Sequence, residues 1–105
     1  MPWLLRDGEV LASLEVAGRA LVAGAGHQGD GAVLLRARLC HTVGATRPID
    51  VAFCDDDLVV VATICPVRPF RLTRPRPKAS CVIEAEAGAF ARWRLQPGDR
   101  LEIKG

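Results

Sequence analysis

The sequence predicts a mainly β domain: a small barrel-like or sandwich-like antiparallel sheet with two short helices. Three observations support this fold class. Short segments alternate apolar and polar side chains, which is the two-residue period of a half-buried strand. Groups of Gly, Pro and Asp separate these segments at short intervals, as turns do in β proteins. Helix-forming composition is confined to residues 17–25 and 87–95, so we expect roughly six to eight short strands.

Length and composition indicate one soluble domain spanning residues 1–105. Half of the residues are hydrophobic, which is enough for a core without a metal or disulfide bonds. No apolar run reaches the roughly 18 residues of a membrane span, and the N-terminus lacks a signal-peptide pattern, so we expect a cytoplasmic protein. The oligomeric state does not follow from the sequence, and a monomer is favoured. The formal net charge of +2 is too small to indicate a nucleic acid or an anionic surface by itself.

The N-terminal segment predicts a β-hairpin. Residues 3–6 form a short strand, and the Asp-Gly pair at 7–8 is a hairpin turn. Residues 9–16 alternate, with Leu14 and Val16 on the face directed to the core.

A short helix and a second strand follow. Residues 17–25 are rich in alanine and poor in β-branched residues, which favours a helix. The glycine-rich residues 24–31 form a loop. The apolar residues 32–35 form a brief strand.

The middle of the sequence predicts the two central strands. Residues 49–54 alternate, with Ile49, Val51 and Phe53 on one face. Three consecutive aspartates at 55–57 form a turn. Residues 58–64 are apolar on both faces, which predicts the most enclosed strand of the domain.

The C-terminal part begins with a loop that contains four of the seven prolines, at 66–77. Proline fixes φ and removes an N–H donor, so we expect an extended surface loop. Residues 81–86 form a strand with Glu84 and Glu86 outward. In the helix at 87–95, Phe90 and Trp93 are three residues apart and dock on the core together.

The chain then turns at Pro97-Gly98-Asp99 and ends in a short strand around residues 101–103. The predicted core collects apolar residues from all of these elements: Leu14, Val16, Leu34, Ile49, Val51, Phe53, Val59, Val61, Ile83, Phe90 and Leu101. Trp93 is expected to be partly buried.

The cysteines do not form a recognisable ligand pattern. No two of the four cysteines are spaced as a C-x-x-C pair, and the two histidines add no metal-ligand spacing. The cysteines are Cys40, Cys54, Cys65 and Cys81. We therefore expect reduced, buried thiols, with no metal and no cofactor.

The order of these features resembles domain-of-unknown-function family 192 (DUF192), a family of small uncharacterised bacterial and archaeal domains. The resemblance extends over about residues 11–103 and is carried by His41-Thr42, the blocks 48–55 and 83–101, and Pro66 after the apolar strand. It implies a mostly β domain with a barrel-like or sandwich-like sheet and no known substrate or cofactor. Two departures from the family pattern stand out. Relatives tend to carry a Gly-Leu-Leu or Gly-Leu-Met stretch where residues 19–22 of this chain run into a longer glycine loop, and relatives tend to carry methionine where this chain has Ala45. If the polar residues before the central strand build a pocket in this family, the resemblance implies a smaller or altered pocket here.

Three side chains are the candidates for catalysis: His41, Asp50 and Cys54. Asp50 and Cys54 share a strand face but lie about 13 Å apart along the strand. His41 could approach either residue across strands, and His41 with Asp50 could act as acid/base groups of a small hydrolase or transferase. The alternative is a structural Asp50, which caps or forms a salt bridge within the preceding loop, with Arg47 as its nearest candidate partner.

Two further motifs are better explained as structure. Gly24-x-Gly26-x-x-Gly29 matches a dinucleotide fingerprint, but a loop and a short strand follow it instead of a helix. The aspartates at 55–57 could attract a cation, but a calcium loop spaces its ligands more widely. We interpret the two motifs as a flexible loop and a solvated turn.

Arginines between the prolines form the largest charge feature, ending at Lys78: Arg68, Arg71, Arg74, Arg76 and Lys78. They could bind a protein partner or an anionic ligand, or form a solvated loop that protects a sheet edge. Nucleic-acid binding would require them to join Arg36 and Arg38 on one continuous face.

The sequence therefore favours a non-enzymatic binding or accessory module. The hydrolase or transferase and the nucleic-acid-associated protein remain the alternatives. The candidate binding surface combines the polar residues before the central strand with the arginines of the proline-rich segment: His41, Thr42, Arg47, Asp50, Arg68, Arg71, Arg74 and Arg76.

Overall fold

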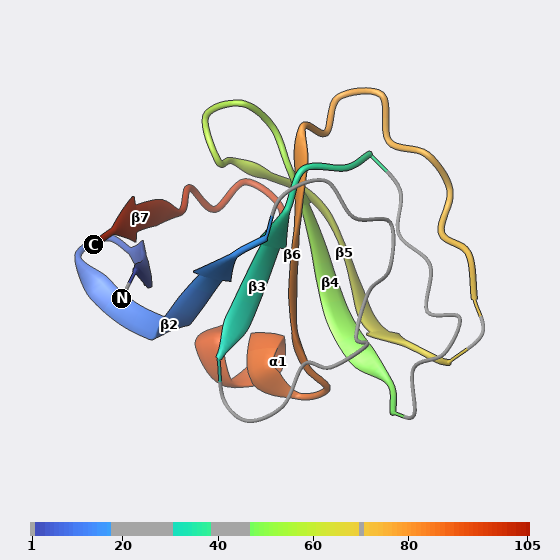
Figure 1. Cartoon of the computed structure of the whole chain (residues 1–105), viewed down its shortest axis with the longest axis horizontal. Helices are drawn as coiled ribbons and strands as arrows, with labels where there is room; N and C mark the ends of the chain where they lie inside the picture. The colour runs from blue at the N-terminus through green and yellow to red at the C-terminus, as the bar shows by residue number, and fades with distance from the viewer. Residues whose placement is uncertain (1, 18–30, 39–46, 70) are drawn as a thin grey trace.

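The computed structural model describes residues 2–17, 31–38, 47–69 and 71–105. Its strands are β1 Trp3–Arg6, β2 Glu9–Val16, β3 Ala32–Leu35, β4 Ile49–Cys54, β5 Val60–Val67, β6 Cys81–Glu86 and β7 Glu102–Lys104, and its helix is α1 Ala89–Trp93. The strands form one sheet in the order β5-β4-β6-β3-β2-β1-β7 (Figure 1). The predicted mainly β class is confirmed.

The sheet is mixed and not closed into a barrel, which corrects the predicted antiparallel barrel or sandwich. Strands β2 and β3 pair in parallel, because the long connection between them leaves room for a crossover that a tight turn would not allow. The segment before β7 contacts the chain at the start of β5, where Val59 bridges to Arg100 and the Val60 N–H donates to the Asp99 carbonyl. Within the described residues no continuous ladder joins β5 to β7.

The N-terminal hairpin is confirmed. β1 and β2 pair antiparallel, and the turn residues Asp7 and Gly8 both have positive φ, 52° and 80°. Both central residues of a type I′ turn need positive φ, and an Asp-Gly pair adopts it at low cost. The local sequence is therefore sufficient to specify this hairpin.

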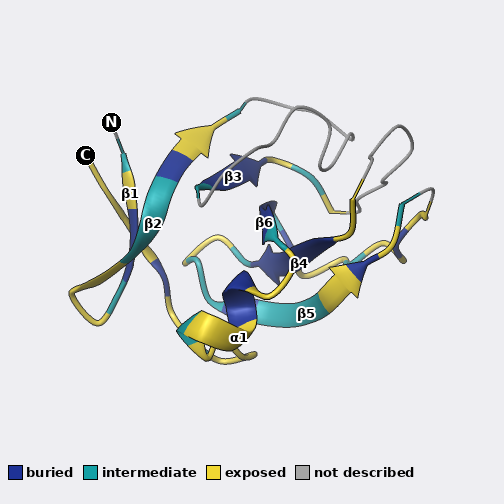
Figure 2. Ribbon diagram, turned by 90° about the horizontal axis from the view of Figure 1, so that it is seen from below, coloured by how far each residue is buried: buried dark blue, intermediate teal, exposed yellow. Residues whose placement is uncertain are grey.

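Two apolar clusters cover the two faces of the central strands. On one face, Ala52 of β4 and Ile83 of β6 pack with Phe90 of α1. On the other face, Phe53 and Val82 pack with Ala79, which belongs to the segment between β5 and β6. All six residues of β4 are buried, and β3, β4 and β6 form the buried centre of the ribbon in Figure 2.

Strand β5 is an edge strand, so the prediction that residues 58–64 form the most enclosed strand was wrong. Only two of its eight residues are buried, because β4 is its one full neighbour in the sheet. The strand also continues through Pro66 to Val67, beyond the predicted break at Pro66. An edge strand tolerates proline because one side of its backbone needs no ladder partner.

The predicted core is confirmed for most residues and corrected at three valines. Val16, at the end of β2, is 55% exposed, whereas Val59 and Val61 are partly buried. Glu84 was predicted to point outward but is 2% exposed. Its register partners are Val33 and Val51, so its face of the sheet is covered as well. The alternation of apolar and polar residues separates the two faces of a strand. It does not show whether other parts of the chain cover both faces.

Helix α1 is shorter than predicted, because Gly88 before it and Arg94 after it both have left-handed backbone conformations. Phe90 and Trp93 dock together as expected, with ring centroids 5.6 Å apart, and Trp93 is partly buried. The other predicted helix, at 17–25, lies almost entirely outside the described residues. In the described part of the chain no helix is long and apolar enough to cross a membrane.

Candidate functional site

Asp50 of β4 is hydrogen-bonded to the turn between β6 and α1. Its side chain is 1% exposed, and Oδ2 accepts hydrogen bonds from the backbone N–H groups of Gly88 and Phe90, each at 3.0 Å. The expected partner Arg47 is exposed, and the cap is formed by a segment about 40 residues further along the chain. Asp50 therefore caps the first turn of α1. Most of the preceding loop lies outside the described residues, so the predicted cap or salt bridge within that loop stays a prediction.

The other oxygen of the same carboxylate, Asp50 Oδ1, is buried and has no hydrogen-bond partner among the described residues. His41 and Thr42 lie outside those residues, so the proposed pairing of His41 with Asp50 or Cys54 stays a prediction. The glycines of the fingerprint-like motif at 24–29 also lie outside them.

Replacing Gly88 with alanine should lower the free energy of unfolding by about 1 kcal/mol. Gly88 has φ +95°, and a Cβ there would meet Arg92 only at 3.7 Å, so the cost comes from the backbone conformation. Gly88→Asn should cost less because asparagine tolerates positive φ. Urea denaturation of the two variants measures the difference, and equal losses would contradict this explanation.

In the acidic turn at 55–57, a carboxylate oxygen accepts hydrogen bonds from nearby backbone N–H groups. Asp55 Oδ1 accepts hydrogen bonds from the N–H groups of Asp57 and Val59, at 2.9 and 3.0 Å, which is the geometry of an Asx turn. Asp56 and Asp57 are exposed. Across the described ranges, no group of three or more His, Cys, Asp or Glu side chains could hold a metal ion.

Cys54 and Cys81 are register partners on β4 and β6. The Cys54 thiol donates a hydrogen bond to the Cys81 sulfur, and this bond, together with burial, raises the pKa of Cys54. The same hydrogen bond lowers the pKa of Cys81. Of the two thiols, Cys81 therefore ionises more readily, and Cys54 keeps its proton. Cys54 and Cys81 are buried as predicted, whereas Cys65 is exposed, which corrects the prediction for that residue. Cys40 lies outside the described residues.

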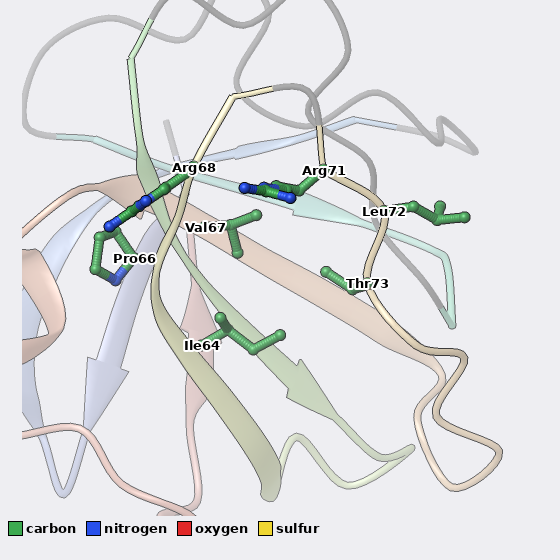
Figure 3. A pocket seen from close by; sticks show the side chains of 7 residues that line it. All are labelled: Ile64, Pro66, Val67, Arg68, Arg71, Leu72 and Thr73. Carbon is green, nitrogen blue, oxygen red and sulfur yellow. The ribbon is translucent and has the colours of Figure 1, made fainter.

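A hollow of about 350 Å³ lies where β5 passes into the segment at 68–78, which we call the arginine loop. We call this the arginine hollow, and its lining is shown in Figure 3: Ile64, Pro66, Val67, Arg68, Arg71, Leu72 and Thr73. Val67 and Thr73 are buried, whereas Leu72 is 71% exposed. The hollow therefore combines apolar side chains with two exposed arginines.

The arginine loop is held against the sheet by Arg76. Its guanidinium carbon lies 5.5 Å from the centre of the Phe53 ring, within the range of a cation–π interaction. Its backbone N–H donates to the Arg38 carbonyl at 2.8 Å. Of the predicted arginines, Arg68 and Arg71 line the hollow, Arg74 is exposed elsewhere on the loop, and Arg76 anchors the loop.

Sequence reasoning missed the apolar part of this site. Ile64 and Leu72 are separated by eight positions and line the same hollow because the chain turns back after β5. One local signal was available: Leu72 stands between Arg71 and Thr73 in a proline-rich segment, where a large apolar side chain has no strand or helix to bury it.

Two solved structures show the same fold. One is a protein of unknown function from Novosphingobium aromaticivorans, with a TM-score of 0.77 and 17% identity, covering 96% of this chain and 82% of that one. The other, provisionally named a transcription regulator, is from Sinorhizobium meliloti, with a TM-score of 0.77 and 20% identity, covering 97% of this chain and 91% of that one.

A third structure, provisionally named an exported protein, is from Burkholderia pseudomallei. Its TM-score is 0.59 at 17% identity, and the match covers 98% of this chain and 24% of that one. A comparison with curated protein sequences found no significant match. The profile of the family DUF192, described as an uncharacterized ACR, matches residues 36–103, which is more than half of the chain. The chain therefore belongs to the DUF192 family.

Proposed function

We propose that this domain is a non-enzymatic binding module and that the arginine hollow is its binding site. The observation that carries the proposal is the composition of that hollow: Arg68 and Arg71 beside the apolar side chains of Ile64 and Leu72. The ligand that fits is an extended protein segment with an acidic side chain and a neighbouring apolar side chain.

The chemistry of the hollow supports this ligand class. A guanidinium offers five N–H donors in a planar fork, so it can bind a carboxylate while keeping a contact within its own chain. Leu72 exposes most of its side chain to water, and covering an exposed leucine is favourable by about 1.5–3 kcal/mol at most. An acidic and apolar segment would satisfy both features at once.

The environment of Asp50 also favours binding over catalysis. Its carboxylate is 1% exposed, and one oxygen already accepts two backbone N–H groups. A general acid or base must reach the substrate within hydrogen-bond distance. This geometry supports a structural role for Asp50.

Nucleic-acid binding is the second candidate, and one contact favours it. The hydrogen bond from the Arg76 N–H to the Arg38 carbonyl brings the arginine loop beside the segment that carries Arg36 and Arg38. The relative provisionally named a transcription regulator is consistent with this candidate. Binding through such a surface would fall steeply with salt, because each phosphate contact releases counterions.

Changing Arg68 and Arg71 together to Glu should abolish capture of the protein partner or weaken it at least about tenfold, since charge reversal repels the acidic segment. The matched control changes Arg74 and Lys78 to Glu; these residues are exposed on the same loop but do not line the hollow. The immobilised domain and both variants are incubated with an extract of the source cells, and captured proteins are identified by mass spectrometry.

Duplex DNA of about 20 base pairs is titrated in parallel by fluorescence anisotropy at about 50 and 200 mM salt. The proposed hollow is supported if only the Arg68/Arg71 variant loses its partner. If both variants recover the same partners as the wild type, the arginine hollow is not the recognition surface. DNA binding that weakens equally in both variants and falls steeply with salt would favour the second candidate.

A further inference from the structure

We infer that Cys54 and Cys81 form an oxidation site, in which a hydroperoxide converts this pair of thiols into a reversible disulfide. We call the two residues the dithiol. They come from strands that are separate in sequence and adjacent in the sheet, and each is the other's register partner. The binding function proposed above does not use them.

The geometry of the dithiol permits a bond with little rearrangement. Register partners on antiparallel strands have Cα atoms about 4.5–5.5 Å apart, which lies within the range of disulfides. Their Cβ atoms, about 4.5–5.5 Å apart, must approach slightly. Cys54 ends β4 and Cys81 begins β6, and the β4–β5 register shifts between Phe53 and Cys54, so the required adjustment falls where the sheet is already irregular.

The surroundings of the two sulfurs indicate that Cys81, and not Cys54, reacts first with the hydroperoxide. Cys81 is 6% exposed, whereas Cys54 is 0% exposed. Cys81 also lines a second hollow, of about 310 Å³, together with Arg36, Asp55 and Asp56. The hydrogen bond from Cys54 and the charge of Arg36 lower the pKa of Cys81, and burial and the two aspartates oppose them.

The reaction has two balanced steps. The Cys81 thiolate attacks one oxygen of hydrogen peroxide; the S–O bond forms, the O–O bond breaks, and hydroxide leaves and takes up a proton as water. The Cys54 sulfur then attacks the sulfenic sulfur of Cys81; the S–S bond forms, the S–O bond breaks, and the departing hydroxide takes the Cys54 proton. Two thiols are oxidised by two electrons, and one peroxide is reduced to two waters.

A variant that retains only the dithiol tests this inference directly. The full chain with Cys40→Ser and Cys65→Ser has Cys54 and Cys81 as its only cysteines. Hydrogen peroxide should lower its intact mass by about 2 Da with loss of both free thiols, and dithiothreitol should restore them. A non-reducing tryptic digest should join residues 79–92, which contain Cys81, to the peptide that contains Cys54. Circular dichroism before and after treatment checks that the domain remains folded.

A second variant separates the two steps. Adding Cys54→Ser to the same background removes the resolving thiol but keeps a hydrogen-bond donor toward Cys81, so Cys81 should accumulate as a sulfenic acid that dimedone traps. The peroxide concentration is set so that it oxidises the exposed Cys65 of the wild-type chain. The inference is overturned if, at that concentration, the variant with only Cys54 and Cys81 remains a monomer whose mass has not fallen by 2 Da. Direct oxidation of Cys81 to a sulfinic acid while Cys54 is present, or a bridge between two chains, would also overturn it.

Discussion

Replacing Phe53 with alanine will lower the free energy of unfolding by about 3–5 kcal/mol, which is the usual cost of deleting a buried aromatic ring. Phe53 is 0% exposed and belongs to the cluster beneath the arginine loop. The substitution also removes the ring that faces the Arg76 guanidinium. Urea denaturation followed by circular dichroism measures the change, and we expect a lower midpoint with a similar slope.

Phe53→Leu is the matched control, because it keeps an apolar side chain of similar reach and removes the aromatic face. We expect it to lose about 1–2 kcal/mol, since most of the apolar volume remains. A Phe53→Ala variant as stable as the wild type would contradict the position of this ring in the core.

Replacing Asp50 with alanine will lower the free energy of unfolding by about 2–4 kcal/mol, because two backbone N–H groups lose their acceptor. Those groups belong to Gly88 and Phe90, and the Phe90 side chain is itself 1% exposed. The loss of the cap should therefore also disturb the docking of α1. Thermal unfolding reports the loss of stability. Near-ultraviolet circular dichroism in a Trp3→Phe background, which leaves Trp93 as the one tryptophan of the sequence, reports the docking of α1.

Asp50→Asn distinguishes this structural role from a chemical one. The asparagine side chain keeps an oxygen that can accept both N–H groups, so we expect a loss below about 1 kcal/mol. A loss as large as that of Asp50→Ala would show that the cap does not depend on the acceptor oxygen. If an activity is found, an Asp50→Asn protein that is folded but inactive would instead support the hydrolase or transferase alternative.

The sequence determined the local structure of this protein. The strands at 32–35, 49–54 and 81–86 and the hairpin turn at 7–8 agree with the structure, because alternation and turn chemistry act between neighbouring residues. The resemblance to DUF192 is likewise confirmed over residues 36–103. The arginines were recognisable as a candidate surface from their spacing among prolines.

The tertiary structure alone decided which strand lies at an edge, which faces are covered and which distant side chains meet. The apolar segment that continues into β5 has one full neighbour instead of two, and Glu84 is buried although its strand alternates. The contact of Cys54 with Cys81 depends on strand order and register. Those properties arise from pairing between segments far apart in the chain, and a pattern within one segment carries no information about its partner.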